Sequence, residues 1–182
     1  MSTRTIIELR DLPLLPHPSC GAGSVRALRV TARVHAAGLL TIEYGLHADL
    51  PQLRLAPVTA AGQRRDGLWH HTCFELFAHR GAQAGYLEFN FSPSGDWAAY
   101  EFDSYRQGRR ALAQRQIGVA VQLMAADQLQ LRAHAELGAG LDWELCPAAV
   151  IEARDGSLSY WASEHGDVRP DFHRAPARIP AA

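Results

Sequence analysis

Apolar and polar residues alternate with a period of two through most of the chain, and this pattern constrains the fold more than any other feature. Such alternation is typical of β-strands that bury one face and leave the other in water. In the segment 25–35, Leu28, Val30, Ala32 and Val34 alternate with polar residues, and the segment 40–46 repeats the pattern after an Ala-Ala-Gly turn. The two segments are therefore predicted to form a hairpin.

Further hairpins are predicted downstream. The alternating segments 117–123 and 129–137 are joined by the turn-like "AADQ", and 143–154 meets 157–163 across Asp155-Gly156. An Asp-Gly pair is typical of a two-residue type I′ turn. Helical periodicity is weak outside 105–114. About nine or ten strands with regular turns predict an all-β fold, an antiparallel β-sandwich of the jelly-roll or immunoglobulin-like kind.

The length of 182 residues fits one domain. Residues 1–23 and 175–182 are rich in proline, alanine and other small residues. We expect them to be an N-terminal arm and a C-terminal tail with little structure of their own, flanking a domain over 24–174.

Composition argues against several classes of partner. The net charge is −1 and no basic run exceeds two arginines, so a nucleic-acid binder is not indicated. No stretch approaches the roughly 20 apolar residues that span a bilayer. The N-terminus is a poor signal peptide, and three widely spaced cysteines indicate neither a disulfide framework nor a zinc site. We therefore expect a cytoplasmic protein without a membrane partner, whose oligomeric state the sequence does not predict.

The stretch "FNFSPSGDWAAYEFD" predicts a hairpin with an unusually polar face. With a turn of two or four residues, Ser92 falls opposite Trp97 and Glu88 falls opposite Glu101. Asn90 then joins these residues on the outer face. The residues expected to face the core are Leu87, Phe89, Phe91, Ala98, Tyr100 and Phe102.

The preceding strand extends this polar face. Thr72, Phe74, Leu76 and Ala78 alternate with His71, Cys73 and Glu75 in "HHTCFELFAH". Carboxylates and amides bind sugar hydroxyls well because they accept, and the amide also donates, hydrogen bonds. Exposed indoles are costly unless an apolar surface covers them, and Trp69, Trp97 and Trp161 lie on the polar side of strands or beside turns. The alternatives are a solvated face for the carboxyls and core packing for each tryptophan.

Three motifs together resemble a known family. "DGLWHHTCFELF", "YLEFNFSPSGDWAAYEFDSYRQG" and "LSYWASEHGDVRPDFHRA" are similar to the bacterial DOMON-like domains related to carbohydrate-binding module family 9, over residues 24–174. The resemblance implies a ligand-binding β-sandwich. Relatives in that superfamily bind sugars, often between tryptophans and sometimes with structural calcium, or bind haem b through a methionine and a histidine.

The candidate ligand-binding residues combine the polar face with the resembling motifs. They are Trp69, His71, Glu75, Glu88, Asn90, Trp97, Glu101, Arg106, Trp161, His165, Asp171 and His173. By motif position, the tryptophans would be stacking platforms, and Glu75, Glu88, Asn90 and Arg106 would form hydrogen bonds. In "HGDVRPDFH", Asp171 and His173 could instead tie the C-terminal segment onto the sheet.

We expect a non-catalytic module that binds a small polyhydroxylated ligand such as a carbohydrate. No cofactor is predicted, with calcium and haem b as alternatives and any metal ligands unknown. Haem fits less well, because apart from Met1 the only methionine is Met124, which has no evident histidine partner. A glycoside hydrolase is the enzymatic alternative, since Glu75, Glu88 and Glu101 on neighbouring strands could be spaced as its two carboxyls require.

Overall fold

The computed structural model describes residues 5–59, 61–112, 117–138, 142–166 and 168–174. Within them it contains two 3₁₀ helices, η1 (Leu50–Gln52) and η2 (Leu68–His70), and eleven strands. The strands are β1 (Thr5–Pro16), β2 (Val25–His35), β3 (Leu39–Ala48), β4 (Cys73–Arg80), β5 (Tyr86–Phe91), β6 (Trp97–Phe102), β7 (Arg110–Ala111), β8 (Gly118–Ala125), β9 (Gln128–Glu136), β10 (Trp143–Glu152) and β11 (Leu158–Ala162). No helix among the described residues is long and apolar enough to cross a membrane.

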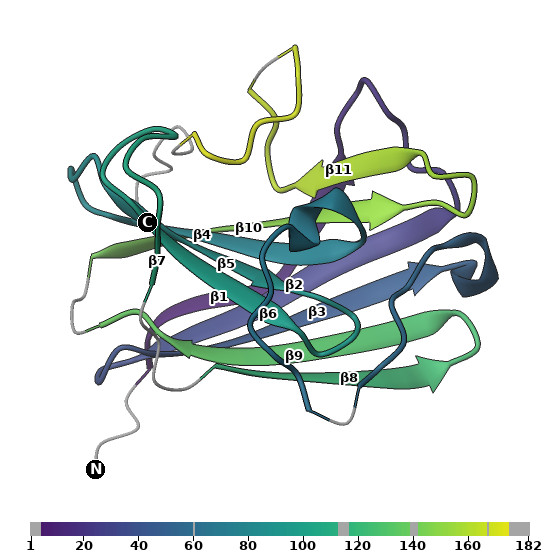
Figure 1. Cartoon of the computed structure of the whole chain (residues 1–182), viewed down its shortest axis with the longest axis horizontal. Helices are drawn as coiled ribbons and strands as arrows, with labels where there is room; N and C mark the ends of the chain where they lie inside the picture. The colour runs from purple at the N-terminus through teal and green to yellow at the C-terminus, as the bar shows by residue number, and fades with distance from the viewer. Residues whose placement is uncertain (1–4, 60, 113–116, 139–141, 167, 175–182) are drawn as a thin grey trace.

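The strands form one antiparallel sheet in the order β7-β6-β5-β4-β10-β11-β1-β2-β3-β9-β8 (Figure 1). The all-β prediction is confirmed. The separate two-sheet sandwich is not confirmed, because β1 pairs with β2 along most of its length and with β11 at Leu15 and Pro16. The sheet therefore curls continuously from one half to the other. The sheet has more strands in its described part than the sequence predicted, because β1 and β7 were not predicted.

The prediction that residues 1–23 have little structure of their own is wrong for β1. Prolines within a segment argue against a strand, yet they are tolerated at bulges and strand ends. The pairing of β1 with β2 shifts between Leu9 and Leu12, where Asp11 has a φ of 48°. This bulge lets β1 continue past Pro13 and bury Leu14. The predicted tail at 175–182 lies outside the described residues.

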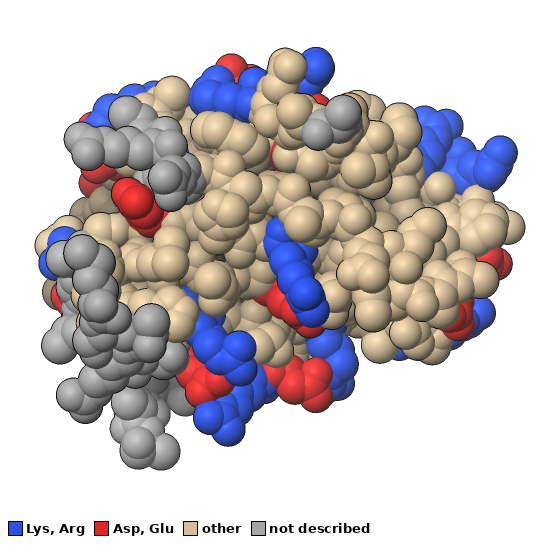
Figure 2. All heavy atoms as spheres, turned by 90° about the horizontal axis from the view of Figure 1, so that it is seen from below, with Lys and Arg blue, Asp and Glu red and all other residues tan. Residues whose placement is uncertain are grey.

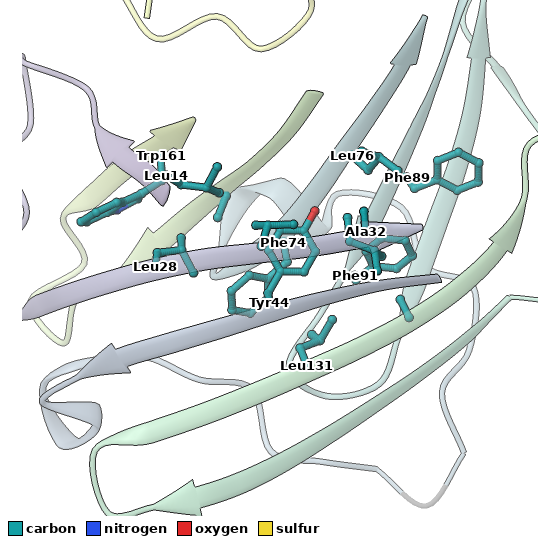
Figure 3. Packing of buried hydrophobic residues seen from close by; sticks show 14 of the residues in the cluster. Leu14, Leu28, Ala32, Tyr44, Phe74, Leu76, Phe89, Phe91, Leu131 and Trp161 are labelled. Carbon is teal, nitrogen blue, oxygen red and sulfur yellow. The ribbon is translucent and has the colours of Figure 1, made fainter. Parts of the chain in front are cut away.

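The main core lies between the two halves of the curled sheet (Figure 3). The rings of Tyr44 on β3 and Phe74 on β4 are 5.1 Å apart, and the Tyr44 hydroxyl donates a hydrogen bond of 2.5 Å to the Glu75 carbonyl. The alternation predicted for the first hairpin is confirmed, since its apolar positions are buried here; they are Leu28, Val30, Ala32, Val34, Leu40, Ile42, Tyr44 and Leu46.

Ion pairs cover the outer face of the half that contains β2, β3 and β9. Arg33 pairs with Glu8 at 2.8 Å, and Arg132 pairs with Glu43 at 2.7 Å. In the view from below, acidic and basic side chains lie next to one another rather than in regions of one charge (Figure 2). Exposed pairs of this kind contribute little stability each.

Two hairpin turns differ from prediction in the same way. The N–H of Ser92 donates to the Asp96 carbonyl at 2.8 Å, and the N–H of Gly95 donates to the Ser92 carbonyl at 3.0 Å. Gly95 has a φ of +95°. This pattern matches a three-residue loop, a type I turn followed by a left-handed glycine.

The hairpin between β10 and β11 repeats that pattern. Ala153 donates to Ser157 at 2.8 Å, Gly156 donates to Ala153 at 2.9 Å, and Gly156 has a φ of +91°. Asp155 has no positive φ, so the predicted type I′ turn, which requires positive φ at both central residues, is wrong.

The three-residue loop after β5 changes the pairing with β6 by one residue. The observed partners are Leu87 with Glu101, Glu88 with Tyr100, Asn90 with Ala98 and Phe91 with Trp97. A shift of one residue moves every side chain of β6 to the opposite face. The predicted facing of Glu88 with Glu101 is therefore wrong. Ala98, Tyr100 and Phe102, which were expected in the main core, share the outer face with Glu88 and Asn90.

The segment 105–114, the one place where the sequence has helical periodicity, is not a helix in its described part. Its described part contains a turn closed by Ser104 and Gln107, followed by the short strand β7.

Candidate functional site

A cavity of about 460 Å³ lies over the outer face of β10, β4 and β5. Three segments form its walls: η2 with Trp69, the loop after β6 with Arg106 and Arg109, and the C-terminal segment with Phe172 and His173. In Figure 1 this C-terminal segment, drawn in yellow, runs from the end of β11 toward the side of the molecule where β7 lies. Segments far apart in the sequence thus enclose one face of the sheet.

A larger depression of about 620 Å³ lies on the outer face of β2, β3, β8 and β9. Its charged side chains are already occupied, since Arg33 pairs with Glu8 and Arg132 with Glu43. The smaller cavity is therefore the stronger candidate for ligand binding.

Buried carboxyl and amide groups lie at the bottom of the smaller cavity. Register places Glu75 opposite Asn90 and Phe77 opposite Glu88, so all four share the outer face of β4 and β5. Asn90 donates from Nδ2 to Oε1 of Glu88 at 2.7 Å, and the Cys73 thiol donates to Oδ1 of Asn90 at 3.5 Å. These two bonds fix the orientation of Glu88.

Glu75 is only 3% exposed, and its Oε1 has no hydrogen-bond partner among the residues that the structure describes. Burial, reinforced by the charge of Glu88, raises the pKa of the Glu75 carboxyl well above its ordinary value. The group therefore stays protonated to a higher pH than an exposed glutamate, and a protonated carboxyl can donate as well as accept a hydrogen bond.

Burial also raises the pKa of Glu88. The hydrogen bond from Asn90 and the positive charges of Arg109 and Arg106 oppose that rise. The pKa of Glu88 therefore stays above its ordinary value, with three neighbouring groups that oppose the rise, whereas no described neighbour opposes the rise at Glu75.

Aromatic rings line the same face. Tyr86 and Phe102 stack with their centroids 4.6 Å apart and an interplanar angle of 7°. The Trp69 indole meets the Tyr100 ring edge-on at 5.8 Å. Together with Phe77, these residues form a second, smaller apolar cluster outside the main core. The cavity therefore combines polar groups at its floor with flat apolar surfaces at its side.

Asp171 fastens the C-terminal segment to the loop after β6. It accepts a hydrogen bond from Nη2 of Arg106 at 2.9 Å, another from the hydroxyl of Tyr105, and a third from the backbone N–H of His173 at 3.1 Å. Although burial alone would raise the pKa of Asp171, the bonds from Tyr105 and Arg106 lower it. These contacts agree with the alternative prediction for Asp171, in which it ties the C-terminal segment onto the sheet.

His173 presents a neutral imidazole to the cavity. Burial, together with the charge of Arg106, lowers its pKa to about 4. The Tyr86 hydroxyl lies 2.7 Å from Nδ1 and accepts the backbone N–H of Arg106 at 3.3 Å. Since the Tyr86 hydrogen is then available for Nδ1, we assign the imidazole proton to Nε2. Nε2 is thereby a hydrogen-bond donor.

The structure brings together seven of the twelve predicted site residues. Five line the cavity, and Asn90 and Asp171 position neighbours within it; the five are Trp69, Glu75, Glu88, Arg106 and His173.

Three other predictions are wrong about the face. Trp97 is half-buried and packs against the main core, opposite Phe91. Glu101 lies on that same side and pairs with Arg110 at 3.2 Å. Both follow from the shifted register of β6. Trp161 is 3% exposed within the main core, because it pairs with Ala149 on the inner face of β10 (Figure 3).

The two remaining histidines lie outside the cavity. His71 is exposed just before β4 and bonds Oε2 of Glu152 at 2.8 Å. His165 bonds the Leu15 carbonyl through Nε2 at 2.8 Å and meets the His17 ring edge-on. Both side chains make structural contacts at these positions.

Sequence reasoning missed several residues of the site. Tyr100 and Phe102 were assigned to the core by the wrong register, and Tyr86 and Arg109 were not singled out. The signal that could have corrected the register was Pro93-Ser94-Gly95, whose last residue supplies the left-handed position of a three-residue loop.

Calcium and haem b, the two alternative cofactors, stay predictions. Among the described residues, no three His, Cys, Asp or Glu side chains cluster so as to hold a metal ion. Met124 is 54% exposed on the edge strand β8, in the other half of the sheet. A haem site built from that methionine does not fit this cavity.

Comparison with known proteins gives one structural likeness. No family model matches the chain, and no curated protein matches it. The fold is similar to the crystal structure of a "putative carbohydrate-binding protein" from Bacteroides uniformis, with a TM-score of 0.57 over 81% of this chain and 75% of that one. The two sequences are 13% identical, so the likeness concerns the fold alone.

Proposed function

We propose that this protein is a non-catalytic module that binds a small polyhydroxylated ligand, a carbohydrate, in the cavity over β10, β4 and β5. The observation that carries the proposal is the buried Glu75 carboxyl, which borders the cavity and has an oxygen without a hydrogen-bond partner among the described residues. A buried polar atom left unpaired costs about 1–3 kcal/mol, and a ligand hydroxyl would remove that penalty.

The remaining chemistry of the cavity suits a sugar. Glu75 and Glu88 offer acceptors for hydroxyl groups, and Nε2 of His173 offers a donor. The indole of Trp69 provides a flat apolar surface for the C–H face of a sugar ring. A volume of about 460 Å³ lies within the range of small-molecule sites.

Two likenesses agree with this proposal. The Bacteroides uniformis protein of similar fold carries the description "putative carbohydrate-binding protein". The motif resemblance to DOMON-like domains related to carbohydrate-binding module family 9 points to the same class of ligand, and membership of that family is part of the proposal.

Isothermal titration with a panel of mono- and oligosaccharides tests the proposal. We expect at least one sugar to bind the parent protein, and Glu88→Gln and Trp69→Ala to weaken binding by roughly tenfold, which corresponds to about 1.4 kcal/mol. Glu164→Gln is the matched control, because Glu164 is exposed and does not line this cavity. Folded protein that gives no heat with any sugar would refute the proposal.

Hydrolysis of a glycoside is the second candidate. The neighbouring carboxyls Glu75 and Glu88 favour it, because burial raises the pKa of the first well above its ordinary value, while Asn90 and the arginines oppose the rise in the pKa of the second. Turnover of chromogenic glycosides with a bell-shaped pH profile, abolished by Glu75→Gln, would replace the binding proposal with this one.

A further inference from the structure

Arg109 is held in a fixed position beside the cavity. Its guanidinium carbon lies 5.6 Å from the centroid of the Trp69 ring and 5.1 Å from that of Tyr100. Contact with two aromatic faces restrains a guanidinium that would otherwise move freely in water. The cation therefore stands next to the indole that the proposed function uses as a platform.

No described residue forms an ion pair with Arg109. Its charge helps to lower the pKa of Asp66 and opposes the rise in the pKa of Glu88, but both acids are bonded to other groups. Asp66 accepts hydrogen bonds from Arg64 and from the Tyr100 hydroxyl, and Glu88 accepts one from Asn90. The N–H groups of Arg109 are thus left for a partner that comes from outside the described chain.

Neighbouring arginines differ from Arg109 in this respect. Arg106 also lines the cavity, but its Nη2 is occupied by Asp171 at 2.9 Å. Arg110 is paired with Glu101 at 3.2 Å and also with Asp103. The cation in this loop that can receive an incoming anion is Arg109.

We propose that the sugar bound here carries an anionic substituent, a carboxylate or a phosphate, which pairs with Arg109 while the ring packs on Trp69 and the hydroxyls meet Glu75 and Glu88. This inference rests on the proposed function, because it names the class of ligand for the same cavity. A guanidinium can bind either oxyanion through two parallel hydrogen bonds, which gives direction as well as attraction.

The buried carboxyls do not prevent such a ligand from entering. Glu75 is held in its neutral form by burial, and Asn90 donates to Glu88. Asp171 is already matched by Arg106. A ligand whose anion lies at Arg109 and whose hydroxyls lie over the floor therefore meets a separate partner at each end.

The test compares matched sugars on the full chain by isothermal titration. Galacturonate and glucuronate are compared with galactose and glucose, and glucose 6-phosphate forms the phosphate arm. We expect acidic sugars to bind the parent at least tenfold more tightly than their neutral counterparts. Arg109→Gln should abolish that preference, and Arg110→Gln, the control from the same part of the chain, should retain it.

The outcomes separate the two proposals. Preference for uronates or for the sugar phosphate, lost in Arg109→Gln, supports the inference and identifies the anion. Equal binding of acidic and neutral sugars, unchanged in Arg109→Gln, overturns this inference and leaves the proposed function standing. Absence of binding by every sugar, neutral or charged, refutes both.

Discussion

Replacing Glu75 with Gln is expected to stabilise the protein at neutral pH although it alters the floor of the cavity. The Glu75 side chain is buried, one of its oxygens lacks a partner among the described residues, and Glu88 lies on the same face. Burial and the charge of Glu88 raise the pKa of its carboxyl well above the reference value of 4.5. In the unfolded chain the same carboxyl is hydrated and ionises near its ordinary value.

The size of the effect follows from this difference. Above pH 4.5, the folded protein retains a proton that the unfolded chain has lost. The free energy of unfolding then falls as pH rises, by at most about 1.4 kcal/mol per pH unit, until the folded carboxyl itself ionises. Gln binds no proton, so this contribution is missing from the variant. Its stability advantage over the parent should therefore grow with pH across that window and stay constant below it.

Urea unfolding at a series of pH values from about 4 to about 8 measures the difference directly. The parent, Glu75→Gln and Glu164→Gln are compared under identical buffers. Glu164 is exposed, so its replacement controls for the exchange of Glu by Gln without a change in a buried group.

Parallel stability curves for the parent and Glu75→Gln across this range would refute the reasoning. Such a result would mean that the Glu75 carboxyl ionises at the same pH in the folded and unfolded states. The cavity floor would then be hydrated, and the unpaired oxygen would not support a ligand site.

Three more substitutions test the packing that positions the site. Trp161→Ala should destabilise the protein by about 3–5 kcal/mol in urea unfolding, with sugar affinity of the folded protein unchanged, because the indole fills the main core. Tyr44→Phe should lower the free energy of unfolding by about 1 kcal/mol in the same assay, because it removes the hydrogen bond to the Glu75 carbonyl. Gly95→Ala should lower the free energy of unfolding by about 1 kcal/mol or more in a thermal unfolding assay, because the φ of Gly95 is +95°. Gly45→Ala should lower it less, because no atom lies close to the added methyl group.

The strand pattern of the first hairpin was predictable because each strand carries its own alternation. Leu28 and Val30 face the core on β2, as Ile42 and Tyr44 do on β3, and no information from elsewhere in the chain was needed. Strand β1 was not predictable in this way. Its prolines break the local pattern, and its last residues pair with β11, which is distant in sequence, as well as with β2, the next strand along the chain.

In the candidate site too, the sequence predicts the face of a residue only where alternation within its own strand determines it. Glu75, Glu88 and Asn90 were correctly grouped, because alternation within β4 and β5 fixes the face of each. Trp97 and Glu101 were misplaced, because their face depends on whether the loop before β6 has an odd or even number of residues. Alternation within a strand does not predict the length of the loop before it. The glycine at the end of the loop, which can adopt a positive φ, was the feature that indicated three residues.

Glu75 and Glu88 occupy positions where apolar side chains would stabilise the fold more. An aromatic cluster surrounds them. With leucine or methionine at both positions, this cluster could pack against the sheet as a small second core. The sheet instead keeps two carboxyls under a cavity, which lowers stability at neutral pH. Proteins commonly have lower stability where a group is retained for binding. If so, Glu75→Gln must both raise stability and weaken ligand affinity, and a variant that gains stability with affinity intact would show that the ligand does not contact Glu75.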